Sequence, residues 1–254
     1  MTWARKRQFL ILGSIAAIVL ALVAVTAIAV IYDTPTCTDG KQNGEETGVD
    51  CGGACTYLCL AEVERPIVRF VRAFSPQPNR YDVIAYIDNR NAGAAAREVE
   101  ATIELYSATR ELLTTRTVSI DIPAGTTVPL YIPEAYRGEA PIAQVFVTFN
   151  DATLRFYEPK DDHIVPTVAG LELENTDAPR VRATLENPSA FTLYGIKPIA
   201  TVFDIEGNAL AASQTYVSQI GAYGKTNAFF TWNAPFVGTP ARVEVLPVMS
   251  VSLP

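Results

Sequence analysis

The chain opens with a long apolar segment that follows a short basic cluster. Arg5, Lys6 and Arg7 come first, and Phe9 to Tyr32 then form a run of 24 residues without a charge. A helix of this length reaches roughly 36 Å, more than the ~30 Å hydrocarbon core of a bilayer. A secretory signal peptide shares the basic start, but its apolar region has only about 7–15 residues. The pattern therefore predicts an uncleaved transmembrane helix at residues 9–32, preceded by a tail at residues 1–8.

The distribution of basic residues predicts the orientation of this helix. Three basic residues precede the span, and the next one along the chain is Lys41. Basic flanks of a membrane helix stay in the cytoplasm. We therefore expect a cytoplasmic amino terminus in the cell membrane and an extracytoplasmic location for residues 33–254.

The remaining apolar positions follow the period of β-strands. In residues 99–105 apolar side chains alternate with Glu100, Thr102 and Glu104, and a similar alternation at 199–203 ends in the turn 204–208. A period of two is typical of half-buried strands. Short strands separated by turns every 8–12 residues indicate an antiparallel sandwich. The expected fold class is mainly β.

An internal repeat relates two segments of the chain at a spacing of 98 residues. Repeats of solenoids span about 20–50 residues, so this spacing indicates two copies of a whole domain. We expect Ig-like sandwiches at residues 63–158 and 159–254. The matching positions are Asp88-Asn89 with Glu186-Asn187, Ala92 with Ala190, Thr117 with Thr215, Ile122 with Ile220, Ala143 with Ala241 and Val145 with Val243. The aromatics expected in the core or on a sheet face of the second copy are Phe191, Phe203, Phe229, Phe230 and Trp232.

All four cysteines lie in a short collar, residues 33–62, next to the predicted span. They are Cys37, Cys51, Cys55 and Cys59. An even number of cysteines in an exported segment predicts two disulfides, with three pairings open. A four-thiolate zinc site is the alternative, but the spacings lack the C-x2-C pairs that such sites use.

Acidic and amide side chains are interspersed with glycines in this collar. Asp39, Asn43, Glu46 and Asp50 supply hard oxygen ligands on a backbone that glycine makes adaptable. These four residues are candidate Ca²⁺ ligands, although the order of an EF-hand is missing. The alternative is a series of turns whose acidic groups are solvated.

Two local patterns resemble known exported modules. Residues 37–55 read C-x-D-G-x-x-N-G-x-E-T-x-x-D-C-G-G-x-C and resemble a short module of exported prokaryotic surface proteins. This resemblance implies an extracytoplasmic location and no particular activity. The second copy, with Phe191-Thr-Leu-Tyr194, resembles small Ig-like exported domains of the F-x-L-Y type, except that Gly195 replaces the usual Asp. This second resemblance implies a fold and transfers no functional residue.

The charge balance limits the classes of partner. The formal net charge is −7, and the exported part, without the three basic residues of the tail, has 17 Lys and Arg against 27 Asp and Glu, a net −10. An acidic domain without a basic cluster is not expected to bind nucleic acid or anionic headgroups.

The sequence shows no recognisable catalytic set. His163 is the single histidine, and it lies beside Asp161 and Asp162 in a polar linker that we expect to be solvated. Phosphate-binding, metalloprotease and nucleophile-elbow motifs are absent. We expect no catalytic or cofactor-binding residues and no enzyme.

The expected function is that of a membrane-anchored extracytoplasmic protein. Its role would be non-catalytic binding or scaffolding in the cell envelope, with a protein or the cell wall as partner. The alternative is an accessory subunit of a secretion, pilus or transport assembly, in which the span packs against partner helices through Gly13, Ser14, Ala16, Ala17, Ala21 and Ala24.

Overall fold

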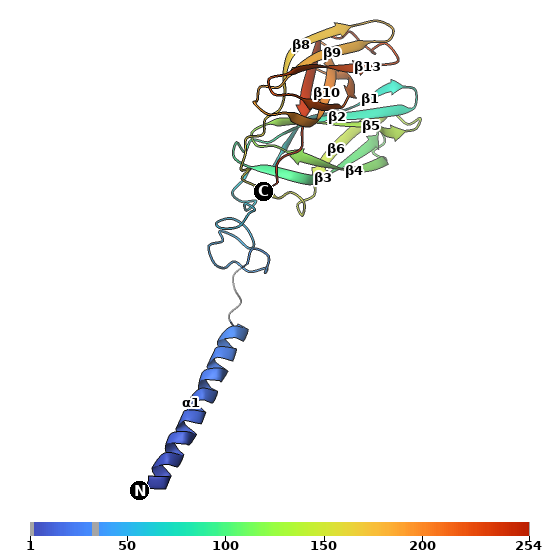
Figure 1. Ribbon diagram of the computed structural model, residues 1–254. Helices are drawn as coiled ribbons and strands as arrows, with labels where there is room; N and C mark the ends of the chain where they lie inside the picture. Colours follow the sequence, from blue (N-terminus) through green and yellow to red (C-terminus); the bar gives the residue numbers. More distant parts are fainter. Residues whose placement is uncertain (1–2, 32–35, 254) are drawn as a thin grey trace. The chain divides into compact units, whose positions relative to one another are not determined.

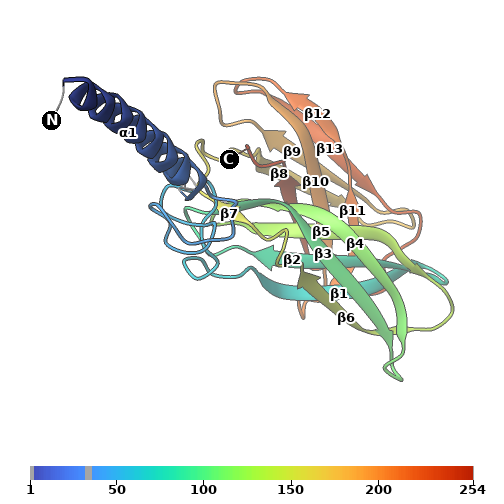
Figure 2. The same ribbon diagram turned by 90° about the horizontal axis from the view of Figure 1, so that it is seen from below.

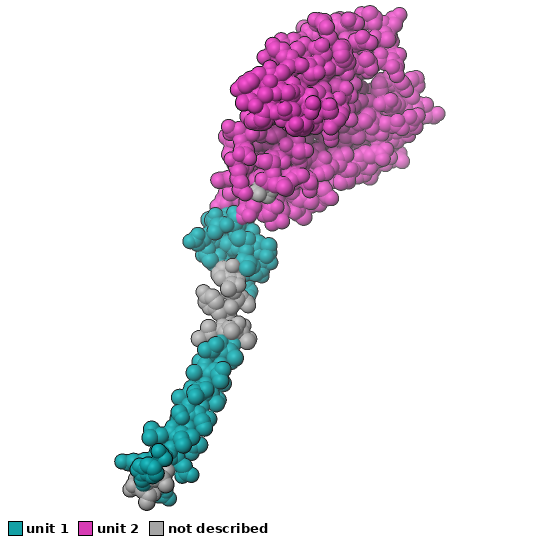
Figure 3. All heavy atoms as spheres, in the orientation of Figure 1, with its two compact units in different colours: residues 1–55 teal, residues 56–254 magenta. Residues whose placement is uncertain are grey.

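The computed structural model describes residues 3–31 and 36–253 of the chain. The chain divides into two compact units, Met1–Cys55 and Thr56–Pro254, which Figure 3 shows in different colours. This division falls inside the segment 33–62 that the sequence predicts as a collar. Tyr32 and residues 33–35, where we expect the span to join the collar, lie outside the described residues.

Helix α1, Trp3–Ile31, confirms the apolar helix at the N-terminus (Figure 1). The side chains of residues 5–27 are all exposed. The hydroxyls of Ser14 and Thr26 donate to the carbonyl oxygens of Ile11 and Leu22, both at 2.9 Å, which satisfies them within the helix. Residues Arg5–Ala27 are long and apolar enough to cross a membrane, a property that a signal sequence shares.

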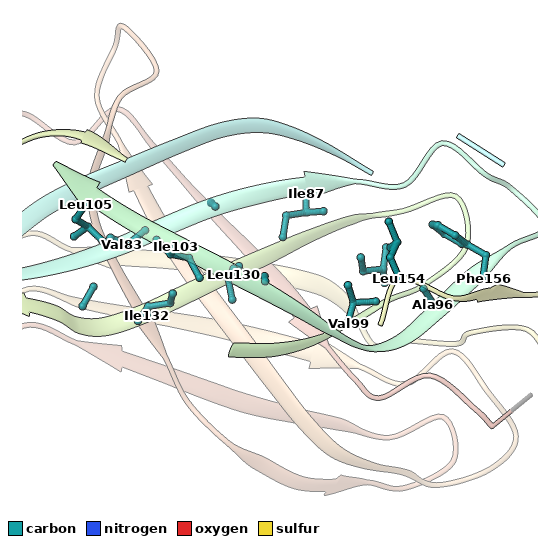
Figure 4. Close-up of a cluster of buried hydrophobic side chains, with 14 of the residues drawn as sticks. Val83, Ile87, Ala96, Val99, Ile103, Leu105, Leu130, Ile132, Leu154 and Phe156 are labelled. Atoms are coloured by element: carbon teal, nitrogen blue, oxygen red, sulfur yellow. The ribbon is translucent and has the colours of Figure 1, made fainter. Parts of the chain in front are cut away.

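The first copy is a sandwich of two antiparallel sheets. One sheet has the order β1-β2-β5, from Ile67–Gln77, Arg80–Asp88 and Thr127–Arg137. The other has the order β4-β3-β6, from Leu112–Ile122, Ala95–Ser107 and Ile142–Phe149, and the short β7, Phe156–Tyr157, also pairs with β3. Apolar residues of β2, β3 and β5, among them Val83, Ile103 and Leu130, fill the space between these sheets (Figure 4).

The second copy has the same topology. Its first sheet has the order β13-β9-β8, from Lys225–Thr231, Arg180–Glu186 and Thr167–Glu174. In the other sheet β10, Leu193–Phe203, pairs with β11, Ala209–Gln214, with β12, Val217–Ile220, and with β14, Arg242–Val248. The strands β1, β2, β3, β5 and β6 correspond to β8, β9, β10, β13 and β14 at an offset of 98 residues, and β4 corresponds to β11 and β12 together. The structure therefore places the internal repeat on matching strands.

The aromatic residues of the second copy are divided between core and surface. Phe203, Phe230 and Trp232 are buried, whereas Phe229 lies exposed on the outer face of β13. Phe191 differs from the expectation, because it lies in the loop between β9 and β10 and is exposed. Residues on either side of Phe229 point into the core, so the alternation of the strand turns its ring outward.

The two sandwiches pack against each other sheet on sheet. Figures 1 and 2 show the sheet of β1, β2 and β5 lying against the sheet that contains β10 and β11. Ile84 and Tyr86 of β2 contact a cluster that includes Ile199 and Phe203 of β10. The Tyr86 hydroxyl donates to Thr201 Oγ1 at 3.1 Å across this junction. We call this contact the junction.

Truncation of a side chain at the junction should destabilise both sandwiches, which together form the second compact unit, Thr56–Pro254. We call this unit the β unit. Ile84 is fully buried, whereas Ile205, which serves as a matched control, is 83% exposed. We expect Ile84→Ala to lower the free energy of unfolding by about 3 kcal/mol, because it leaves a cavity between two sheets. Ile205→Ala should change it by less than about 0.5 kcal/mol. Denaturant unfolding of the detergent-solubilised chain measures both, and equal effects of the two variants would contradict the role of the junction.

Candidate functional site

The cysteines are oxidised, as the sequence predicts. Cys37 and Cys55 form a disulfide with a Cα–Cα distance of 5.7 Å. Cys51 and Cys59 are disulfide-bonded as well, and the chain has no free cysteine. The thiolates that the zinc alternative requires are therefore not available.

The four candidate calcium ligands hold the turns of the collar. The Asp50 carboxylate accepts hydrogen bonds from the backbone N–H of Gly40 at 3.0 and 3.1 Å, and Glu46 Oε2 accepts one from the N–H of Asn43 at 3.2 Å. Asp39 Oδ2 accepts a hydrogen bond from Asn43 Nδ2 at 2.8 Å. That hydrogen bond lowers the pKa of Asp39, so the carboxylate stays ionised.

These carboxylates do not converge on one point. Within the described parts of the chain, Glu46 with Cys37 and Cys55 forms the one close group of three His, Cys, Asp or Glu side chains, and both sulfurs of that group are in a disulfide. The acidic groups act as acceptors for backbone amides, a role that the sequence analysis did not assign. Calcium binding by Asp39, Asn43, Glu46 and Asp50 stays a prediction.

His163 lies against apolar residues instead of in solvent. It is half-buried in the segment between β7 and β8, beside a cavity of about 190 Å³ that Pro123, Val128 and Met249 help to line. Burial lowers the pKa of His163, and the charge of Asp121 partly opposes this shift. Asp161 and Asp162 are exposed, and neither forms a hydrogen bond with His163 in the described part of the chain. The linker is exposed at Asp161 and Asp162, as expected, whereas His163 is half-buried, and neither of these acids orients it as a base.

A buried asparagine organises one end of each sandwich. Asn89, 1% exposed, donates from Nδ2 to the carbonyl oxygens of Ala94 and Pro123, both at 2.8 Å. These bonds hold the loop 89–94 to the turn 123–126. We call these two segments the first tip.

Asn187 repeats this arrangement at the offset of 98 residues. It is also 1% exposed, and its Nδ2 donates to the carbonyl oxygens of Phe191, Ile220 and Gly221 at 2.7, 3.1 and 3.0 Å. The loop 187–192 and the turn 221–224 form the second tip. The buried side-chain amide of Asn187 holds both segments in place, because leaving one of its hydrogen bonds unmade would cost about 1–3 kcal/mol of stability.

The two tips differ at the positions that face outward. In the first tip Gly125 has φ +60°, and its N–H donates to the carbonyl of Asn91 at 2.9 Å. Tyr223 takes the same place in the second tip, with φ +52° and an N–H that donates to the carbonyl of Ser189 at 3.0 Å. A tyrosine in the left-handed region costs on the order of 1 kcal/mol relative to glycine.

A second glycine of the first tip is also replaced by an aromatic residue. Phe191 corresponds to Gly93, and the Phe191 and Tyr223 side chains are 56% and 69% exposed. Nothing in the local sequence around either residue marks it as part of a site. The substitution of two glycines by aromatics at the 98-residue offset is the signal that identifies them.

A larger hollow of about 530 Å³ opens at the edge of the junction. Arg69, Phe203, Arg242 and Glu244 are among the residues that line it. The Arg242 guanidinium carbon lies 4.2 Å from the centroid of the Phe203 ring, and Arg242 Nη1 lies 3.7 Å from Glu244 Oε2. The guanidinium of Arg242 therefore already has partners within the protein, Phe203 and Glu244, and is less available to a ligand. For this reason we regard the second tip as the stronger candidate for a recognition surface.

The comparisons with known proteins give no family. No family model and no curated protein matches the chain. Among solved structures, the chain is similar to red sea bream transglutaminase, with 14% identity, a TM-score of 0.20, and coverage of 70% of this chain and 29% of that one. The chain thus spans less than a third of that enzyme's length, and a likeness at this TM-score carries no argument about fold or activity.

The burial of His163 makes stability depend on pH. Above its ordinary pKa of 6.5 the imidazole is neutral in the folded and the unfolded chain. Below that pH the unfolded chain binds a proton that the folded chain resists, so the free energy of unfolding should fall as the pH drops from 6.5.

Thermal unfolding at a series of pH values, for the protein and for His163→Gln, measures this dependence. The variant should lose the part of the pH dependence that lies just below pH 6.5. An unchanged profile would show that this side chain does not control it.

Proposed function

We propose that the chain is a single-pass membrane-anchored protein with a non-catalytic binding or scaffolding role outside the cytoplasm, in the cell envelope. One observation carries this proposal: an apolar helix whose side chains at residues 5–27 are all exposed is followed by a segment whose cysteines are all oxidised. Helix α1 needs a nonpolar environment, and disulfides persist in oxidising compartments. The basic residues before the span favour a cytoplasmic amino terminus.

A binding role fits the chemistry of the β unit better than catalysis does. His163 faces an apolar cavity and has no hydrogen-bonded acid among the described residues. Exposed aromatics on rigid loops at one end of an Ig-like sandwich are instead typical of recognition surfaces. We infer that a protein or the cell wall is the partner.

Fractionation tests the anchor and its orientation. We expect the full-length chain to remain in the membrane pellet after alkaline carbonate extraction, with residues 1–32 still attached. External protease should digest residues 33–254 in intact spheroplasts, while a tag fused ahead of Met1 is protected. Release of a shortened soluble chain would mean that the segment is a cleaved signal peptide.

A second candidate function rests on the surface of α1. Gly13, Ala17 and Ala21 recur every four residues and lie on one face of the helix. Such small-residue faces allow close approach of another membrane helix. The chain would then be an accessory subunit of a secretion, pilus or transport assembly.

Replacement of the span separates the two functions. In the assembly role, an unrelated transmembrane helix in place of residues 9–32 should abolish co-purification with partner membrane proteins. Gly13→Leu and Ala17→Leu should have the same effect, whereas substitution on the opposite face, Ile15→Leu, should not. In the anchoring role, all these variants should behave as the original protein does.

A further inference from the structure

The second tip exposes two aromatic rings at positions where the first copy, with the same fold, has glycines. The first copy builds the equivalent turn with Gly125 and Gly93, whereas the second copy has Tyr223 and Phe191. Tyr223 keeps the left-handed backbone of the glycine that it replaces. Residues that are held in such conformations concentrate at functional sites. Neither ring is buried, so packing does not explain the exchange.

The second tip is also free of charge. Residues 187–192 and 221–224 contain no Asp, Glu, Lys or Arg, and the two charges that border them, Glu186 and Lys225, pair with each other at 3.1 Å. In the first tip Arg90 stands where the second has Pro188. The partner of the second tip is therefore not selected by charge, which disfavours phosphates, acidic polymers and anionic headgroups.

The first tip shows what kind of chain segment this end of the fold accepts. Two segments that lie outside the strands contact it. Asn91 exchanges hydrogen bonds with the backbone of Glu64, accepting from the N–H at 2.8 Å and donating to the carbonyl at 2.7 Å. Ala124 of the turn packs on a cluster that contains Val251 from the C-terminal segment.

Among the residues that the structure describes, no comparable segment covers the second tip. Ala222, the counterpart of Ala124, is exposed, and so are Phe191 and Tyr223. The end that contacts two segments outside the strands in the first copy thus carries exposed aromatic rings in the second.

We propose that the second tip binds an extended, uncharged, proline-rich segment of a partner protein. Phe191 and Tyr223 would stack on its proline rings, and Asn187 positions both loops without touching the ligand. Proline-rich segments are extended before they bind, lose little entropy, and dock on exposed aromatic rings. This proposal rests on the binding role proposed above and specifies its partner.

The test uses the full-length chain in detergent micelles. The probe is decaproline with acetylated and amidated ends, titrated by isothermal calorimetry. The variants Phe191→Gly and Tyr223→Gly restore the residues of the first tip. Each should weaken binding by about tenfold or more, as loss of an aromatic hot-spot residue does.

Stability measurements separate a lost contact from a lost fold. Tyr223→Gly should leave the Tm unchanged or raise it, because glycine adopts φ +52° without strain. Tyr216→Ser removes an equally exposed ring from the connection between β11 and β12 and should not alter binding. Asn187→Ala should weaken binding and also lower the Tm, since it releases both loops.

Three results would overturn the proposal. They are absence of decaproline binding, binding that neither glycine variant weakens, and tip-dependent binding of dextran, a neutral polysaccharide, in place of the peptide. Membrane retention of the same variants is measured in parallel. If the chain stays anchored while the tip fails to bind decaproline, the inference falls and the membrane anchor stands.

Discussion

The burial of β2 on both faces is the constraint on which the β unit depends. Val83 and Ile87 point into the core of the first sandwich, and Ile84 and Tyr86 point into the junction. A strand that is apolar on both faces cannot lie at the surface of a single sandwich. The second copy supplies the missing cover through Ile199 and Phe203 of β10. The junction thus joins two sandwiches into one packed body whose loops are held in defined positions.

The repeat keeps its internal framework and varies its surface. Asn89 and Asn187 sit at equivalent positions, are equally buried and bind equivalent loops. A buried amide that satisfies several backbone carbonyls is costly to lose, which accounts for its presence in both copies. Exposed positions of the tips do not have to satisfy buried backbone carbonyls. At these positions the copies differ, with glycines in the first tip and Phe191 and Tyr223 in the second. The framework therefore serves as a common support for two different ends.

Much of the fold was predictable, because it depends on local periodicity. The apolar run at 9–32, the alternation at 99–105 and the 98-residue spacing each reflect a repeating geometry that the chain shows without its neighbours. The candidate site was less predictable. His163 was expected in solvent, and Phe191 in the core or on a sheet face, since linear sequence does not reveal which distant segment covers a side chain. The acidic residues of the collar were predicted as metal ligands, a prediction that stays open, and the structure adds that they accept hydrogen bonds from backbone amides.

By itself the sequence determined the apolar helix, the oxidised state of the cysteines, the β class and the duplication, because length, spacing and alternation suffice for each. Tertiary structure alone decided that the β1-β2-β5 sheet of the first copy packs on the β10 sheet of the second. It also decided that His163 is half-buried against apolar residues and that two aromatic rings stay exposed beside a buried asparagine. The packing of the two sheets and the burial of His163 depend on contacts between residues about 40 to 120 positions apart, and the free energy of such contacts comes from surfaces that meet only after the sheets have formed.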